Sequence, residues 1–309
     1  MRRFFNAVLN VSSIHVFMRG STKAPDSFKE RRRFVWWPTG EYEVLSEVSR
    51  SPISWIGGKS YLAKWIIKHF PPHKCYVEPF GGAASVLLQK PPSDVEVYND
   101  VDGHVVEFFE VLKNDPWQLV SILEHMPYSR LLYEGMLKIA KANAWPRDKT
   151  KRVAMWLYMQ IGAFAGKRYG GWGHGKSVKI PRKLDRLATR LVEVSNRLRN
   201  VQIETADFRK IIATYDSADT LFYCDPPYFD AEFYYDAPFC LKDHRNLAEI
   251  LHKVKGKVCL SYSPHPKVDE LYAGWNRDSK MTTTHSFGIT KYSKHKHRPK
   301  RTELLLMNF

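Results

Sequence analysis

Short apolar runs alternate with amphipathic segments along most of this chain. The apolar runs have the length of buried strands and are rich in Val, Leu, Tyr and Phe. They cover residues 75–78, 95–98, 221–224, 258–261 and 303–309. Other segments space their apolar side chains as helices do, at residues 83–90, 103–112 and 243–254. Strands that alternate with helices predict an open α/β sheet with right-handed crossovers and helices on both faces.

Residues 116–200 break this alternation. The pattern there predicts several helices and no strand, interrupted by a glycine-rich stretch at 166–175. Because the block lies between two parts of the α/β pattern, we expect an inserted helical subdomain in an α/β domain formed by residues 51–115 and 201–309. Residues 1–50 carry little sustained period, and we expect them to form an extension outside that domain.

Positive charge is concentrated in two segments. The chain has 48 Lys and Arg against 32 Asp and Glu, a formal net charge of +16. Residues 166–190 hold eight basic residues and one acid, and residues 279–302 hold seven basic residues and no acid. Both segments mix these charges with Tyr, Trp or Gly, as suits phosphate contact beside base stacking. The clustering favours a nucleic-acid partner over a merely basic protein.

The remaining composition narrows the setting. Four cysteines occur, Cys75, Cys224, Cys240 and Cys259. They lack CxxC spacing, so we expect free thiols in a reducing cytoplasm. No apolar run approaches the length of a membrane span, and the N-terminal arginines precede no clean signal-peptide core. His285, His295 and His297 lack companion metal ligands, so no metal is expected.

The strongest single pattern is Asp225-Pro226-Pro227-Tyr228, which directly follows an apolar strand. The exocyclic amine of a base is a poor nucleophile because its lone pair is delocalised into the ring. Acceptors fixed on both amino hydrogens favour a tetrahedral nitrogen, and a carboxylate at a strand end and a carbonyl held by prolines supply them. The Tyr228 ring can stack on a base that has left the duplex. The alternative is an Asp-Pro-Pro turn without chemistry.

A glycine turn follows the first predicted strand, in Glu78-Pro79-Phe80-Gly81-Gly82. Glycines at such a turn let backbone N–H groups approach a nucleotide-like ligand. Asp100 ends the next strand, where dinucleotide folds place an acid on the ribose hydroxyls. A structural turn with a helix-capping aspartate, Asp100 or Asp102, is the alternative. The turn and the spaced acid together favour a nucleotide-like cofactor.

Two weaker signals lie elsewhere in the sequence. Trp55 and Lys59 belong to Trp-Ile-Gly-Gly-Lys, upstream of the first predicted strand. An indole there can pack on a ligand, and an ammonium can meet a ligand carboxylate. Asp207 either lies near an adenine ring or caps a helix that begins at Phe208, and we favour the cap.

These motifs occur in the order and with the spacing of a known family. From about residue 52 to residue 309 the chain resembles the Dam-like (D12) class of site-specific DNA adenine-N6 methyltransferases, which includes many phage and restriction-modification members. The resemblance rests on WIGGK, YVEPFGGAASVLL, VYNDVDGHVVEFFEVLKNDP, LFYCDPPYF and ELLLMNF. It implies a Rossmann-like methyltransferase sheet that uses S-adenosylmethionine (AdoMet), an inserted target-recognition subdomain, and methylation of adenine N6 in double-stranded DNA.

The same resemblance implies roles for individual residues. The adenine pocket would consist of Asp225, Pro226, Pro227 and Tyr228. Contacts to AdoMet would come from Trp55, Lys59, Glu78, Phe80, Gly81, Gly82, Asp100 and Asp225. The candidates for DNA contact, at the centre of the insert, are Lys167, Arg168, Tyr169 and Trp172. For these four residues a solvated loop is the alternative.

Two positions depart from the family's pattern. The family has a Ser-x-Asn segment after the strand that follows the DPPY motif, whereas this chain has Ser261-Tyr262-Ser263-Pro264. No base contact is therefore assigned to this loop. GATC-specific members resemble KWAGGK at the first motif, and here Ser54 stands in place of the first lysine. The resemblance therefore does not imply GATC as the target.

Four competing functions were considered against these motifs. N4-cytosine DNA methyltransferases use the same acceptor logic but resemble Ser-Pro-Pro-Tyr, whereas this chain has Asp225. Methylation of RNA or of a protein glutamine does not account for WIGGK followed by the insert. A non-catalytic DNA-binding protein is opposed by the intact set of Trp55, Lys59, Asp100 and DPPY.

Overall fold

A computed structural model of the chain describes residues 33–36, 42–45, 50–53, 55, 57–163, 169–173, 181–232, 239–283 and 300–309. The strands are β1 (Arg33–Trp36), β2 (Tyr42–Leu45), β3 (Cys75–Glu78), β4 (Val95–Asn99), β5 (Val201–Glu204), β6 (Thr220–Cys224), β7 (Lys257–Tyr262), β8 (Asn276–Thr283) and β9 (Lys300–Met307). The helices are α2 (Ala63–Ile67), α3 (Gly103–Asn114), α4 (Pro116–Glu124), α5 (Arg130–Lys141), α6 (Lys149–Gly162), α7 (Pro181–Leu198), α8 (Phe208–Tyr215), α9 (Leu241–Leu251) and α10 (Pro266–Leu271).

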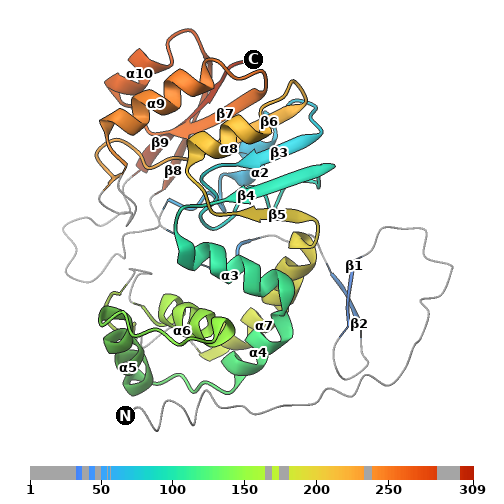
Figure 1. The fold of residues 1–309 in the computed structure, drawn as a ribbon, viewed down its shortest axis with the longest axis vertical. Coiled ribbons are helices and arrows are strands. Elements are labelled where there is room, and N and C mark those ends of the chain that lie inside the picture. The colour runs from blue at the N-terminus through green and yellow to red at the C-terminus, as the bar shows by residue number, and fades with distance from the viewer. Residues whose placement is uncertain are drawn as a thin grey trace, which may run out of the picture.

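Seven strands form one sheet in the order β5-β4-β3-β6-β7-β9-β8 (Figure 1). The first five strands of this order are parallel, and β9 lies antiparallel between β7 and β8. Parallel neighbours require crossover connections. Helices supply them between β4 and β5 and between β6 and β7, whereas no named helix lies between β3 and β4. The predicted α/β sheet is therefore confirmed. The pattern did not identify the edge strands β5 and β8, whose side chains are largely exposed or only partly buried. Strands β1 and β2 form a separate antiparallel pair.

Alternate side chains of the central strands enter two different hydrophobic cores. On β3, Tyr76 belongs to the core shared with α2 and α3, whereas Val77 belongs to the core shared with α8, α9 and α10. Leu305 and Leu306 divide in the same way on β9. Because side chains of a strand point alternately to opposite faces, both faces of the sheet are covered. This arrangement confirms the expected helices on both faces.

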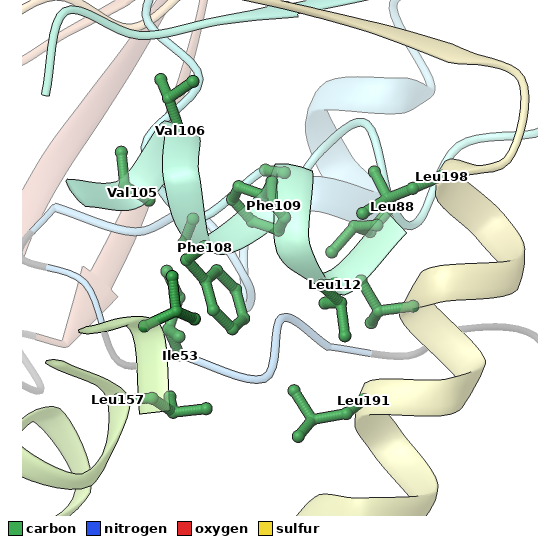
Figure 2. Close-up of a cluster of buried hydrophobic side chains, with 14 of the residues drawn as sticks. Ile53, Leu88, Val105, Val106, Phe108, Phe109, Leu112, Leu157, Leu191 and Leu198 are labelled. Carbon is green, nitrogen blue, oxygen red and sulfur yellow. The ribbon is translucent and has the colours of Figure 1, made fainter. Parts of the chain in front are cut away.

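Helices α4, α6 and α7 of the block at residues 116–200 pack on α3, and α5 packs on α6. Figure 2 shows Phe108 and Leu112 of α3 facing Leu157 of α6 and Leu191 of α7. These side chains join the same buried cluster as Tyr76 of the sheet. The prediction of several helices here is confirmed, and the described part of the block contains no named strand. These helices are thus anchored to the sheet through α3.

The helix predicted for residues 83–90 is wrong. This segment consists of turns, and Ala84 has a left-handed backbone with φ of 53°. The amide of Leu87 donates to the Glu78 carboxylate at 2.7 Å, so it does not donate to the carbonyl four residues earlier. A helix requires that ladder bond. The segment has helical composition, but a buried carboxylate redirects its backbone.

Candidate active site

The motif residues converge at one edge of the sheet. Strands β3, β4 and β6 are parallel neighbours, so their carboxyl ends lie side by side. The glycine turn follows β3, Asp100 follows β4, and Asp225 follows β6. Ligands of open α/β sheets bind at such an edge. The tertiary structure therefore brings together the three strongest motifs of the sequence.

The glycine turn is shaped by close contacts that leave no room for side chains. A Cβ on Gly81 would lie 2.2 Å from the ring of Tyr98, and a Cβ on Gly82 would lie 2.8 Å from Nε1 of Trp55. Gly82 also has a positive φ of 45°. The hydroxyl of Tyr98 donates to the Gly82 carbonyl at 2.7 Å. Glycine is required at both positions, and the turn places Trp55 directly against its backbone.

Asp100 fastens this turn to the start of α3. One carboxylate oxygen accepts from the Gly82 amide at 2.7 Å, and the other accepts from the Asp102 amide at 2.8 Å. Asp102, not Asp100, caps α3 by accepting from the His104 amide. Burial raises the pKa of Asp100 to about 6, against the effect of the two amide donors. The proposed contact of Asp100 with a ribose stays a prediction.

Glu78 lies beneath the turn and is 2% exposed. One oxygen accepts from the hydroxyl of Tyr76 at 2.6 Å and from the amide of Leu87 at 2.7 Å. Burial raises its pKa to about 8, although these donors and the charge of Lys90 act in the opposite direction. In this structure Glu78 holds the backbone behind the glycine turn, and its predicted contact with the cofactor is untested.

A buried network joins Lys59 to the DPPY motif. The Lys59 ammonium lies 2.7 Å from both carboxylate oxygens of Asp225 and 2.8 Å from the carbonyl of Gly57. It also lies 3.5 Å from Glu303 on β9 and 4.9 Å from the ring centre of Tyr228. The Tyr228 hydroxyl is hydrogen-bonded to Glu303 and lies 3.1 Å from Asp225. Glu303 begins the ELLLMNF segment, and no site role was expected for it.

Burial sets the proton affinity of this network. It raises the pKa of Asp225, while the charge and hydrogen bonds of Lys59 lower it. It also raises the pKa of Glu303, again against the effect of Lys59. Asp225 keeps 19% of its side chain exposed, whereas Lys59 keeps 5%. The buried Lys59 ammonium thus fixes the Asp225 carboxylate, which stays partly exposed and can accept a hydrogen bond from a ligand.

The chain beyond Tyr228 is held by stacked rings. Phe229 lies between two imidazoles, with ring centres 3.8 Å from His244 and 4.6 Å from His265. His244 is fully buried and lies 2.8 Å from the hydroxyl of Tyr262. Ser261, the first residue of the segment that departs from the family pattern, lies 3.0 Å from the Tyr223 hydroxyl. These contacts fix the DPPY loop from the side of β7.

Aromatic side chains also gather beside the glycine turn. The rings of Phe80 and Phe208 lie 5.3 Å apart, and Phe239 contacts both. Asp207 accepts from the Arg209 amide at 2.8 Å and caps α8, so the preferred interpretation of this residue is confirmed. Phe239 carried no local signal, because it lies in no motif and approaches Phe80 only through the fold.

The residues predicted to contact DNA divide into two groups. Lys167 and Arg168 lie outside the described residues, as does Ser54. Trp172 packs on the rings of Tyr128 and Tyr133 at 4.2 and 5.3 Å, and Tyr169 has a positive φ of 53°. The hydroxyls of Tyr128 and Tyr133 donate to carbonyls of this glycine-rich loop. Trp172 therefore anchors residues 169–173, and its contact with DNA stays a prediction.

Among the described residues no group of His, Cys, Asp and Glu is arranged to hold a metal ion. None of the helices in the described ranges is both long and apolar enough to cross a bilayer. His285, His295 and His297 lie outside these ranges.

The strand order, the glycine turn after β3 and the acids after β4 and β6 define a Rossmann-like methyltransferase of the α/β class. Residues 55–286 match the family described as D12 class N6 adenine-specific DNA methyltransferase. The chain belongs to this family, and the resemblance that the motifs indicated is confirmed.

Several relatives carry names from the same family. The DNA N-6-adenine-methyltransferase of Escherichia phage P1 is 25% identical over an alignment of 245 residues. The alignment covers 74% of this chain and 31% of that protein. The DNA adenine methylase of Vibrio cholerae is 29% identical over 222 residues, covering 66% of this chain and 76% of that protein. Type II methyltransferase M1.LlaDCHI of Lactococcus lactis subsp. cremoris is 26% identical over 278 residues, covering 82% and 94%.

The extent of these matches differs. This chain spans less than a third of the phage P1 protein but most of the other two. Among solved structures, the rRNA methyltransferase aviRa from Streptomyces viridochromogenes aligns over 80% of this chain and 83% of that chain, with 11% identity and a TM-score of 0.33. That likeness is too low to carry an argument.

Proposed function

We propose that this chain transfers a methyl group from AdoMet to the N6 amino group of an adenine flipped out of double-stranded DNA. The observation that carries the proposal is the placement of Asp225, partly exposed at the end of β6 and held from behind by Lys59 at 2.7 Å. An amine whose nitrogen becomes tetrahedral needs such a fixed acceptor on its hydrogens. Family membership supports adenine as the base.

The residues at the sheet edge fit AdoMet, which when bound supplies an electrophilic methyl group. The glycines at 81 and 82 let this turn pack closely on the rings of Tyr98 and Trp55, and the indole of Trp55 offers an aromatic surface for the ligand. At the end of β4, the apolar side chain of Val101 is 52% exposed next to Asp100. An exposed apolar residue beside an acid suits a purine ring and its ribose.

The protein's own groups then act on the adenine amine. Asp225 and the carbonyl of Pro226 accept the two amino hydrogens, while Pro227 restricts the loop. The ring of Tyr228 offers a stacking surface that offsets part of the cost of unstacking the base. Lys59 fixes the plane of the Asp225 carboxylate. The amine attacks directly, so no covalent intermediate with the protein is required.

DNA binding is assigned to the insert and to the two basic segments. Lys280, Lys300 and Arg301 are exposed on β8 and β9, and β9 also carries Glu303 into the active site. Phosphate contacts on these strands would hold the duplex beside the pocket. We propose that the insert reads the target sequence through its glycine-rich loop.

Lys167 and Arg168 provide the test of that assignment. Replacing either residue with Ala should weaken DNA binding most at low salt. Each replacement should also make the slope of log affinity against log salt shallower by the amount that corresponds to about one phosphate contact. The measurement is fluorescence anisotropy with duplex DNA over a range of salt concentrations. An unchanged slope would remove these side chains from phosphate contact.

The proposal also covers the setting of the reaction. The relatives come from bacteria and phages, which supports action in the cytoplasm of a bacterial or phage-infected cell. N4-cytosine methylation is the second candidate, because the same acceptors suit a cytosine amine. Asp225 and family membership favour adenine.

The decisive experiment is expression in a bacterium that lacks adenine methylation, followed by single-molecule sequencing that detects modified bases. We expect N6-methyladenine in one short motif and no modification with Asp225→Ala. Detection of N4-methylcytosine instead would identify cytosine as the substrate base. Unmodified DNA together with folded wild-type protein would contradict the proposal and favour a non-catalytic DNA-binding protein.

A further inference from the structure

Glu303 is a buried acid at the centre of the site, and the resemblance carried by ELLLMNF assigned it no role. It lies on β9, is 7% exposed, and is hydrogen-bonded to the hydroxyl of Tyr228. Its carboxylate lies 3.5 Å from the ammonium of Lys59. Burial of an ionised acid carries a large desolvation cost unless a cation compensates its charge. The cation nearest to Glu303 is therefore important for its charge state.

Lys59 is already engaged by other acceptors. Its ammonium has three hydrogens, and three oxygens lie within 2.8 Å of it, one on Gly57 and two on Asp225. Glu303 lies farther from Lys59 and accepts from Tyr228 instead. The hydrogen bonds of the network are therefore satisfied, but its charges are not balanced.

The network contains one ammonium and two carboxylates. The charged groups that act on Glu303 are Lys59 and Asp225, and Tyr228 is a neutral hydrogen-bond partner. Asp225 faces Lys59 and Tyr228 and lies within electrostatic range of Glu78 and Tyr223. Within the described part of the chain, Lys59 is the cation that acts on both Asp225 and Glu303. With both acids ionised, the described residues of the pocket carry one surplus negative charge.

We propose that Glu303 makes the pocket anionic and thereby favours binding of a cationic methyl donor over its neutral product. This inference rests on the proposed function, in which AdoMet is the donor. AdoMet carries a positive sulfonium, whereas S-adenosylhomocysteine carries a neutral thioether. A charge in a largely water-excluded site acts strongly on a second charge, so one surplus carboxylate distinguishes the two molecules.

Glu303 acts through charge and position rather than by touching the adenine. Without it, Lys59 and Asp225 would form a neutral pair. With Glu303 ionised, the three groups together carry a net negative charge although Lys59 still pairs with Asp225. Burial raises the pKa of Glu303, so its charge is lost as the pH falls through that raised value. The preference for the cation should therefore decline towards acid pH.

The test is calorimetric binding of three ligands to the full chain and to Glu303→Gln. The ligands are AdoMet, S-adenosylhomocysteine and sinefungin, an analogue with a cationic amine near the sulfonium position. Gln keeps the volume and an acceptor oxygen for Tyr228. We expect AdoMet and sinefungin to bind about three- to tenfold more weakly to the variant, with S-adenosylhomocysteine changed less than about twofold.

A matched control is present on the outer strand of the sheet. Glu204 on β5 accepts from the hydroxyl of Tyr215 at 3.0 Å, as Glu303 does from Tyr228, and β5 is the strand farthest from β8. Glu204→Gln should leave all three affinities unchanged. Glu303→Asp keeps the charge and should restore most of the preference for the cationic ligands.

The outcomes separate the inference from the function on which it rests. Equal weakening of all three ligands, or no weakening, would overturn the charge role of Glu303. Failure of folded wild-type protein to bind any of the three would overturn the proposed cofactor. If Glu303→Gln does not fold, the ratio of AdoMet to S-adenosylhomocysteine affinity in the wild type is measured against pH. A ratio that stays constant down to the acid limit of folding would overturn the inference.

Discussion

Two buried charge clusters in the described part of the chain differ in which charge is in excess. In the active site, Lys59 faces Asp225 and Glu303. At the junction of the sheet and the insert, Glu96 of β4 instead faces two cations. Lys90 lies 2.6 Å from Glu96, and Arg197 of α7 forms two bonds to it of 2.5 and 2.7 Å.

The proton affinities of the carboxylates differ accordingly. Burial alone would raise the pKa of Glu96, but the hydrogen bonds and charges of Arg197 and Lys90 outweigh it and lower that pKa. In the active site burial outweighs Lys59, and the pKa values of Asp225 and Glu303 are raised. A carboxylate that is fully compensated holds structure together. One that is only partly compensated remains available to a ligand.

The largest expected effect comes from removing the active-site acceptor. Asp225→Ala should lower turnover by roughly 10²- to 10³-fold or more. Its unfolding free energy should change by less than about 2 kcal/mol, because Glu303 remains 3.5 Å from Lys59. Transfer of a labelled methyl group and urea denaturation measure the two quantities. Near-normal turnover would remove Asp225 from the chemistry.

The junction cluster should show the reverse pattern. Glu96→Gln leaves the two buried cations Lys90 and Arg197 without their carboxylate and should lower the unfolding free energy by about 3–5 kcal/mol. Turnover per folded molecule should be retained. The control is Glu110→Gln, whose exposed pair with Lys149 contributes less than about 1 kcal/mol. Equal losses in the two variants would show that the junction cluster does not stabilise the fold.

Glu78 lies between the two clusters and should give the protein a pH-dependent stability. The Leu87 amide donates to Glu78, and the Leu87 carbonyl accepts from Arg197 at 2.7 Å. The folded pKa of Glu78 is raised from 4.5 to about 8, so the folded state binds the extra proton. Its contribution is present below pH 4.5 and is lost as the pH rises towards 8.

Glu78→Gln should remove this loss. Relative to the variant, the wild type should lose roughly 2–4 kcal/mol of unfolding free energy between about pH 4.5 and 8. Urea midpoints at both ends of this range give the difference. The exposed substitution Glu110→Gln should leave the wild-type slope intact. Parallel pH profiles for wild type and Glu78→Gln would contradict the raised pKa.

The smallest expected effect distinguishes two glycines near these regions. Gly82→Ala should cost about 1–2 kcal/mol, because φ is positive and the new Cβ would meet Trp55 at 2.8 Å. Gly103→Ala, at the start of α3, meets no atom within 4 Å and should be neutral or stabilise by up to about 1 kcal/mol. Thermal unfolding of both variants tests this. A cost for Gly103→Ala equal to that of Gly82→Ala would contradict the strain assigned to the turn.

Local patterns predicted the elements whose causes are local. The strand at 75–78 was located to the residue, and the cap at Asp207 followed from its position before an amphipathic helix. The predicted helix at 83–90 failed because Leu87 bonds to Glu78, and no local pattern shows that competition. The edge strands β5 and β8 were missed because exposure removes the apolar signal.

The sequence by itself determined the family, the order of the motifs and the residues at the ends of β3, β4 and β6. Those conclusions rest on residue type and spacing, which the chain carries directly. Only the tertiary structure placed Lys59 on Asp225, 166 residues away, and Glu303 on Tyr228, 75 residues away. The contact of Glu303 depends on the register of β9 against β7, where Leu304 pairs with Tyr262. Register is fixed by packing between distant segments, so the charge of the active site was decided by the fold.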